Sequence, residues 1–143
     1  MRIELFSVDT GTKANLPYAD GGVKAGFPSP AQDYVSETID LNKELIDHPA
    51  TTFYAKCVGD SMEDFGINDG DLLVIDKSLN PKDGDTVVAY IDGDFTLKKI
   101  KMDESGDSLW LMPGNPAYSP IHVTQENHFI VWGVVTYCIK KQV

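Results

Sequence analysis

The fold is decided most clearly by residues 86–100, TVVAYIDGDFTLKKI, which form two apolar, β-branched runs around Asp92-Gly93. An Asp-Gly pair between such runs is a strong hairpin signal, because glycine adopts a positive φ without steric penalty. Similar runs occupy residues 53–58, 72–75, 109–112 and 129–139, and further Asp-Gly pairs stand at 69–70 and 83–84. Strands at this spacing, without long helices between them, predict a mainly β fold, a compact antiparallel β domain.

The length and the net charge of the chain narrow the classes of function that it can have. The chain has 143 residues, 42% of them hydrophobic, and a formal net charge of −10. One domain with an ordinary core is expected from such a length. The negative charge opposes contact with phosphate backbones, so direct nucleic-acid binding is not expected. No apolar run is long enough for a membrane span, and the N-terminus lacks the pattern of a signal peptide. We therefore expect a cytoplasmic protein without a membrane anchor, a metal or a cofactor.

The N-terminal quarter of the chain differs from the rest. Residues 1–25 are punctuated by glycine, proline, asparagine and aspartate, which predicts a flexible arm rather than a domain. Short helical turns are expected at residues 33–35, after a capping pattern at Ser29, and at residues 41–46, where Asp40 can cap the helix and Pro49 limits it. The two cysteines, Cys57 and Cys138, lie in apolar runs and are expected to be buried thiols rather than a disulfide.

Ser61 is the candidate nucleophile, because it follows a predicted strand in the run GDSM at residues 59–62. A serine hydroxyl needs a base, and the histidines, His48, His122 and His128, stand in no recognisable triad order. Lysine is the alternative base if burial keeps its amine neutral. Strand alternation places Thr96, Lys98 and Ile100 on one face, where the Thr96 hydroxyl could orient the amine. It leaves Lys99, on the other face, as an open alternative.

The Ser61 turn also offers donors for a developing negative charge. The backbone N–H groups of Asp60 and Ser61 could form an oxyanion hole after the tight turn that Gly59 permits. A plain turn serine is the alternative, and the local motif alone does not exclude it.

Several separated blocks resemble one family. They are residues 25–35 (AGFPSPAQDYV), 59–62 (GDSM), 95–99 (FTLKK), 115–121 (NPAYSPI) and 131–135 (VWGVV). Together they resemble the UmuD proteins, the bacterial SOS-mutagenesis members of the LexA-like self-cleaving peptidases. The resemblance implies the LexA/UmuD C-terminal, signal-peptidase-like β fold. It makes Ser61 the nucleophile and Lys98, rather than Lys99, the base, with Thr96, Asp60 and Met62 in support.

The same resemblance implies a cleavage site and partners. The scissile bond is Ala25-Gly26, so that residues 1–25 are removed and residues 26–143 remain as the peptidase core. A homodimer is implied, with a RecA–single-stranded-DNA filament as activator of cleavage. The processed form is implied to serve a UmuC-type Y-family polymerase in replication past DNA damage.

Three other functions compete with self-cleavage. A non-catalytic interaction module of the same fold would leave Ser61 and Lys98 idle. A LexA-type repressor would require a DNA-binding domain, and a signal peptidase would require a membrane anchor; the sequence offers neither. The serine, the lysine and the Ala25-Gly26 bond occur together, which favours the peptidase.

Overall fold

The computed structural model describes residues 2–8, 15–19 and 35–143. Contacts divide the chain into a larger unit, Met1–Val8 with Ala50–Val143, and a smaller one, Asp9–Pro49. Among the described residues, every helix is too short or too polar to cross a membrane.

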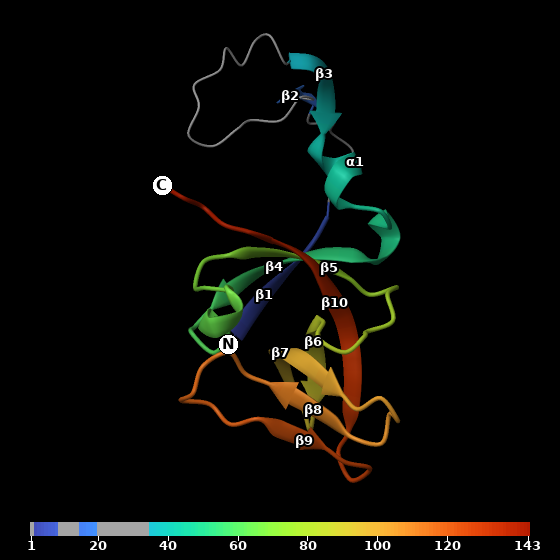
Figure 1. The fold of residues 1–143 in the computed structure, drawn as a ribbon. Helices are drawn as coiled ribbons and strands as arrows, with labels where there is room; N and C mark the ends of the chain where they lie inside the picture. Colours follow the sequence, from blue (N-terminus) through green and yellow to red (C-terminus); the bar gives the residue numbers. More distant parts are fainter. Residues whose placement is uncertain (1, 9–14, 20–34) are drawn as a thin grey trace. The chain divides into compact units, whose positions relative to one another are not determined.

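The larger unit is built on one antiparallel sheet. Its eight strands stand in the order β1-β4-β5-β10-β6-β7-β8-β9, and each neighbouring pair is antiparallel. The long strand β10 lies between β5 and β6 and joins the two halves of the sheet (Figure 1). The strands are β1 (Arg2–Ser7), β4 (Thr52–Val58), β5 (Leu72–Asp76), β6 (Thr86–Ile91), β7 (Asp94–Met102), β8 (Leu109–Met112), β9 (Ile121–Val123) and β10 (Phe129–Ile139). The predicted mainly β, antiparallel fold class is confirmed.

The Asp-Gly pairs play two different parts. Asp92 and Gly93, with φ of 47° and 94°, form the predicted two-residue hairpin between β6 and β7. The other two pairs do not join neighbouring strands tightly. Asp69-Gly70 closes a long connection between β4 and β5, and Asp83-Gly84 precedes β6, whose neighbours are β10 and β7. Their glycines still have φ of 86° and 89°, so the turn signal was right and its hairpin interpretation wrong.

The first residues of the chain contain strands that the sequence analysis did not predict. β1 pairs along its whole length with β4, from Arg2 opposite Val58 to Ser7 opposite Phe53. β2 (Asn15–Ala19) pairs with β3 (Val35–Asp40) in the smaller unit. The helical turn expected at residues 33–35 is wrong at Val35, which begins β3; residues 33 and 34 lie outside the described part. Pairing decides these strands, and local periodicity does not report a distant partner. The boundary at residue 25 stays a prediction.

The second predicted helix is present. α1 spans Leu41–Leu45, and the Asp40 side chain caps it by accepting a hydrogen bond from Asn42 N at 3.1 Å. The helix ends before Pro49, which opens a short 3₁₀ helix, Pro49–Thr51.

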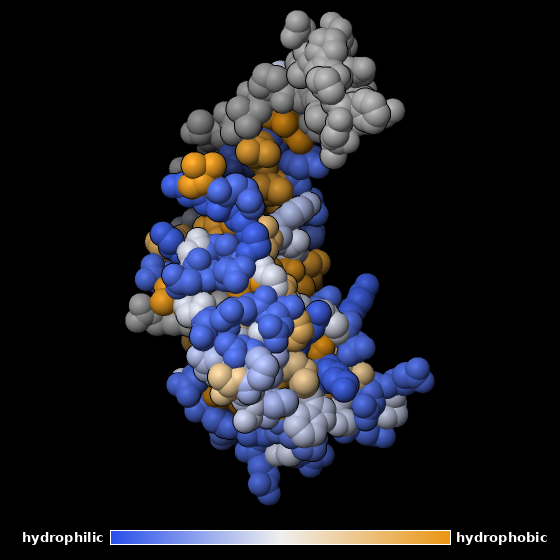
Figure 2. All heavy atoms as spheres, turned by 60° about the vertical axis from the view of Figure 1, so that its left-hand side comes forward, coloured by the Kyte–Doolittle hydropathy of each residue, from blue (hydrophilic) through white to orange (hydrophobic). Residues whose placement is uncertain are grey.

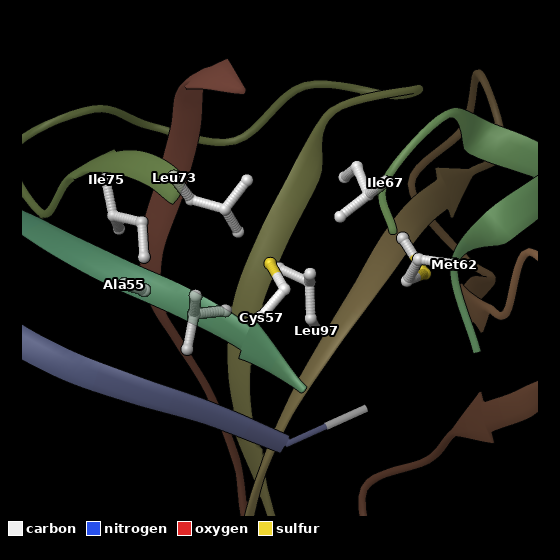
Figure 3. Packing of buried hydrophobic residues seen from close by; sticks show 8 residues of the cluster. Ala55, Cys57, Met62, Ile67, Leu73, Ile75 and Leu97 are labelled. Atoms are coloured by element: carbon white, nitrogen blue, oxygen red, sulfur yellow. The ribbon is translucent and has the colours of Figure 1, made fainter. Parts of the chain in front are cut away.

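Side chains of the large sheet form two hydrophobic clusters. We call the first, which includes residues of β4, β5 and β7 and of the β4–β5 connection, the upper cluster; Figure 3 shows it from close by. The second, between β6, β7, β8 and β10, is the lower cluster. Upper-cluster residues are Ala55, Cys57, Met62, Ile67, Leu73, Ile75, Val88 and Leu97; lower-cluster residues are Val87, Ala89, Ile91, Ile100, Leu111 and Val134.

The two cysteines differ. Cys57 is buried in the upper cluster, as predicted, whereas Cys138 is exposed, so its predicted burial is wrong; both are free thiols.

Figure 2 shows one face of the molecule, which is largely covered by hydrophilic side chains.

Candidate active site

Ser61 lies in the connection between β4 and β5, and the backbone of this connection is held by its own hydrogen bonds. Gly59 has a φ of 112°, and its N–H donates to Asp69 Oδ1 at 2.9 Å. A 3₁₀ turn, Glu63–Phe65, follows the serine and ends at Gly66, whose φ is 77°. Both glycines stand in the left-handed region, which side chains disfavour. The connection therefore has a defined conformation, as the Gly59 turn predicted.

The Ser61 side chain is buried and unpaired. The residue is 0% exposed, and its Oγ has no hydrogen-bond partner among the described residues. Buried polar atoms are nearly always hydrogen-bonded, and an unsatisfied one costs about 1–3 kcal/mol. The hydroxyl therefore keeps its full hydrogen-bonding capacity unused among the described residues.

A second segment, residues 113–118 after β8, clamps the Ser61 turn. Gly114 N donates to Ser61 O, and Asp64 N donates to Gly114 O, both at 2.6 Å. Asp60 is held from the same side: Asn115 Nδ2 donates to its carbonyl at 3.1 Å, and Tyr118 OH donates to its carboxylate at 2.7 Å. We call this segment the clamp. No local sequence pattern predicted a role for this segment in the site, because contacts across more than fifty residues leave none.

Lys98 lies on β7 and is 6% exposed. Its Nζ donates to Leu97 O at 3.2 Å. Burial lowers the pKa of Lys98, since desolvation penalises the ammonium form. Ile100 belongs to the lower cluster and Leu97 to the upper one, as the predicted alternation requires of these two residues. Thr96 makes no hydrogen bond to Lys98 among the described residues, so its orienting role stays a prediction.

Lys99 has a different environment. It is half-buried, and its Nζ lies 4.4 Å from the centroid of the Phe65 ring. A cation at this distance over an aromatic face is stabilised as a cation. The two adjacent lysines therefore differ: Lys98 is the more buried amine, and Lys99 pairs with a ring.

Two contacts bring the Ser61 turn to β7. The first is that of Lys99 with Phe65, four residues after the serine. The second runs through β8, where Met112 is opposite Lys99 and Gly114, two residues later, bonds to Ser61. In addition Met62 and Leu97, the neighbours of Ser61 and Lys98, belong to the same cluster (Figure 3). No hydrogen bond joins Ser61 Oγ to Lys98 in the described structure.

The supporting residues have defined positions. Met62 is fully buried, and its carbonyl accepts hydrogen bonds from Phe65 N at 3.1 Å and Ile67 N at 3.2 Å. Among the described residues, the N–H groups of Asp60 and Ser61 donate to no protein acceptor. Ala25 and Gly26 lie outside the described residues.

The histidines make no hydrogen bond to the Ser61 hydroxyl in the described part of the chain. His122 stacks on Trp110 with ring centroids 4.4 Å apart. Within the same part, His, Cys, Asp and Glu side chains form no group of three or more that could hold a metal ion. A buried hydroxyl beside a strand with a poorly solvated amine suits acyl transfer.

Comparison with known proteins identifies the family. A family model described as Peptidase S24-like matches residues 17–136. Protein SamA of Salmonella typhimurium is 44% identical over 117 residues, which cover 82% of this chain and 79% of SamA. Protein MucA of Escherichia coli is 34% identical over 141 residues, 97% of this chain and 94% of MucA.

A LexA repressor, from Ectopseudomonas mendocina, is 37% identical over 111 residues, 78% of this chain but only 53% of the repressor. The match to the family model spans most of the chain, and SamA and MucA are similar over most of their own lengths. The resemblance to UmuD-like proteins is thus confirmed, and the chain belongs to the S24-like peptidase family.

Proposed function

We propose that this chain is a self-cleaving serine peptidase in which Ser61 is the nucleophile and Lys98 the general base for hydrolysis of the Ala25-Gly26 bond. The observation that carries the proposal is the buried, unpaired Ser61 Oγ in a clamped turn beside β7, the strand that carries the buried Lys98. A neutral lysine amine can accept the proton of a serine hydroxyl, and burial favours the neutral form.

The reaction has two steps. The Lys98 amine takes the Ser61 proton as Oγ bonds to the Ala25 carbonyl carbon, and the N–H groups of Asp60 and Ser61 stabilise the resulting oxyanion. The C–N bond then breaks, the Lys98 ammonium gives its proton to the Gly26 amine, and an Ala25–Ser61 ester remains. Water hydrolyses this ester with Lys98 again as base. The products are residues 1–25 and residues 26–143, and small side chains on both sides of the bond leave room for the approach.

The wider role in the proposal rests on the family resemblance and on the similarity to SamA and MucA. We propose that the cleaved form acts as a homodimeric accessory subunit of a UmuC-type Y-family polymerase in the cytoplasm. A RecA–single-stranded-DNA filament would promote cleavage. The net charge of −10 supports a role through protein contacts rather than through direct binding of DNA.

One observation favours a second candidate, a non-catalytic interaction module. The Lys98 amine bonds to Leu97 O, and no hydrogen bond joins it to Ser61 in the described structure. Catalytic hydrogen bonds are often formed only with substrate in place. Cleavage assays therefore distinguish the two candidates.

The test is the intact mass of the purified chain after incubation at about pH 7 and about pH 10, with and without the activating filament. We expect a product that starts at Gly26 and accumulates faster at high pH, because more of the Lys98 amine is then neutral. Ser61→Ala and Lys98→Ala should abolish it. Lys99→Ala is the matched control on the adjacent residue and should cut normally.

Each outcome has one meaning. Cleavage that persists in Ser61→Ala or Lys98→Ala would contradict the assigned dyad. A chain that stays whole at both pH values, even with the filament, would favour the non-catalytic module.

A further inference from the structure

We propose that cleavage at Ala25-Gly26 uncovers the edge of β4 as a docking strand for an extended segment of a partner protein, which takes the place of β1. The inference rests on the proposed function, since it needs the chain to be cut between β1 and the rest of the sheet. It assigns to the cut a structural consequence: an edge strand of the sheet leaves with the released fragment.

β1 is the end strand of the large sheet, and its pairing partner is β4. All six of its residues are in register with β4. Ile3 packs against the upper cluster, opposite Cys57, and Glu4 stands opposite the exposed Lys56. β1 therefore displays what this edge accepts: an antiparallel strand with an aliphatic side chain opposite Cys57 and an acidic one opposite Lys56.

The cut changes how β1 is held. In the whole chain β1 is tethered to its partner, so the pairing of β1 with β4 is an intramolecular event. After the cut it belongs to a separate fragment, and its binding must offset the loss of translational and rotational freedom. The fragment also carries β2, which among the described strands pairs only with β3, and a two-stranded sheet of this kind is marginally stable by itself. Two of its large apolar side chains bury little area: Leu5 is 40% and Phe6 51% exposed. We expect the fragment to dissociate at micromolar protein.

The uncovered edge would then bind another strand. Cys57 N donates to Asp71 O and Cys57 O accepts from Gly70 N, so residue 57 directs its backbone groups toward β5. Because these directions alternate along a strand, Tyr54, Lys56 and Val58 direct theirs toward β1. Loss of β1 leaves a row of free N–H and C=O groups, and such rows recruit extended peptides by strand addition. Docking on β4 would thus depend on prior cleavage.

The experiment separates this inference from self-cleavage. The recognition sequence of a site-specific protease is inserted between Ala25 and Gly26 in the Ser61→Ala chain, so that the added protease cuts whether or not Ser61 is a nucleophile. Size exclusion and native mass report whether the fragment stays bound at about 10 µM, and residue-resolved hydrogen exchange follows β4, before and after addition of a residue 1–8 peptide at about 1 mM.

We expect the fragment to separate and the amides of Tyr54, Lys56 and Val58 to exchange at least about tenfold faster. The amides of Phe53, Ala55 and Cys57, which face β5, serve as the internal control and should keep their protection. The residue 1–8 peptide should restore the first set, and the same peptide with Ile3→Asp should not. A fragment that stays bound after the cut, faster exchange in both sets of amides, or no effect of the peptide would each overturn the inference.

Discussion

Gly114→Ala tests whether the clamp holds the nucleophile in place. A Cβ at residue 114 would lie 2.9 Å from Met62 Cα, 2.9 Å from Phe65 Cδ2 and 3.0 Å from Met62 C. Ordinary contacts of this kind are about 3.5–4.0 Å, so one backbone must move by about 0.5–1 Å. The Phe65 ring can turn away, but the clash with the Met62 backbone is relieved only if residue 62 or residue 114 moves. Met62 adjoins Ser61, and Gly114 N donates to Ser61 O, so either movement displaces the serine.

The magnitude follows from that displacement. Overpacking a dense site costs about 1–3 kcal/mol in unfolding free energy. A shift of about 1 Å at the reacting atom reduces a rate by about 100-fold. Urea unfolding measures the first effect, and intact mass under conditions in which the wild-type chain cuts measures the second. We expect both the unfolding free energy and the cleavage rate to fall. The cleavage rate should fall by more than the loss of stability alone would cause.

Gly84→Ala is the matched control. A Cβ at residue 84 meets no atom within 4 Å, but the φ of 89° strains any side chain. The variant should therefore lose about 1 kcal/mol of stability and still cut at the wild-type rate. If Gly114→Ala cuts as fast as Gly84→Ala at equal stability, the clamp does not position Ser61. If Gly114→Ala unfolds like the wild type, the close contact to Met62 is wrong.

Three further predictions concern stability. Burial lowers the pKa of Lys98, so the unfolded chain binds the Lys98 proton more readily than the folded chain does. The resulting loss of unfolding free energy is complete below the folded pKa and fades as the pH rises toward the pKa of free lysine. Lys98→Met should therefore raise the unfolding free energy at neutral pH, by an amount that shrinks toward pH 10.5. Urea titrations at several pH values measure this difference. An unchanged or lower stability at neutral pH would contradict the view that burial destabilises the Lys98 ammonium. Burial by itself raises the pKa of Asp71, but hydrogen bonds from Lys140 and from Asn68 N hold this pKa below its usual value. The contribution of ionised Asp71 to stability is present above its unfolded pKa and is lost as the pH falls through its folded pKa. Asp71→Asn should therefore make the melting temperature fall less steeply at acid pH. An unchanged fall would show that Asp71 does not cause the loss of stability in acid. Gly133→Ala places a Cβ 2.6 Å from Cγ2 of the fully buried Ile75 and should cost about 1–3 kcal/mol by urea unfolding, whereas a wild-type midpoint would mean that β10 has room for a methyl group.

The sequence by itself determined the features that depend on neighbours a few residues away. Alternation in residues 95–100 assigned Lys98 and Leu97 to opposite faces of β7, and Asp92-Gly93 specified the hairpin before it. The Asp40 cap likewise acts over two residues. Separated blocks such as GDSM and FTLKK also pointed to the family, because each retains its residues whatever the fold does between them.

Only the tertiary structure decided what covers each face. Alternation puts Lys98 and Lys99 on opposite faces of the strand but does not say which face is buried. In the structure Lys98 is buried, and Lys99 lies over Phe65, a residue of the β4–β5 connection. Cys138 stands in an apolar run and is nevertheless exposed. The pairing of β1 with β4 and the bond from Gly114 to Ser61 each join segments about fifty residues apart. A periodic pattern reports which side chains share a face, whereas burial, pairing and clamping depend on the segment that folds onto that face.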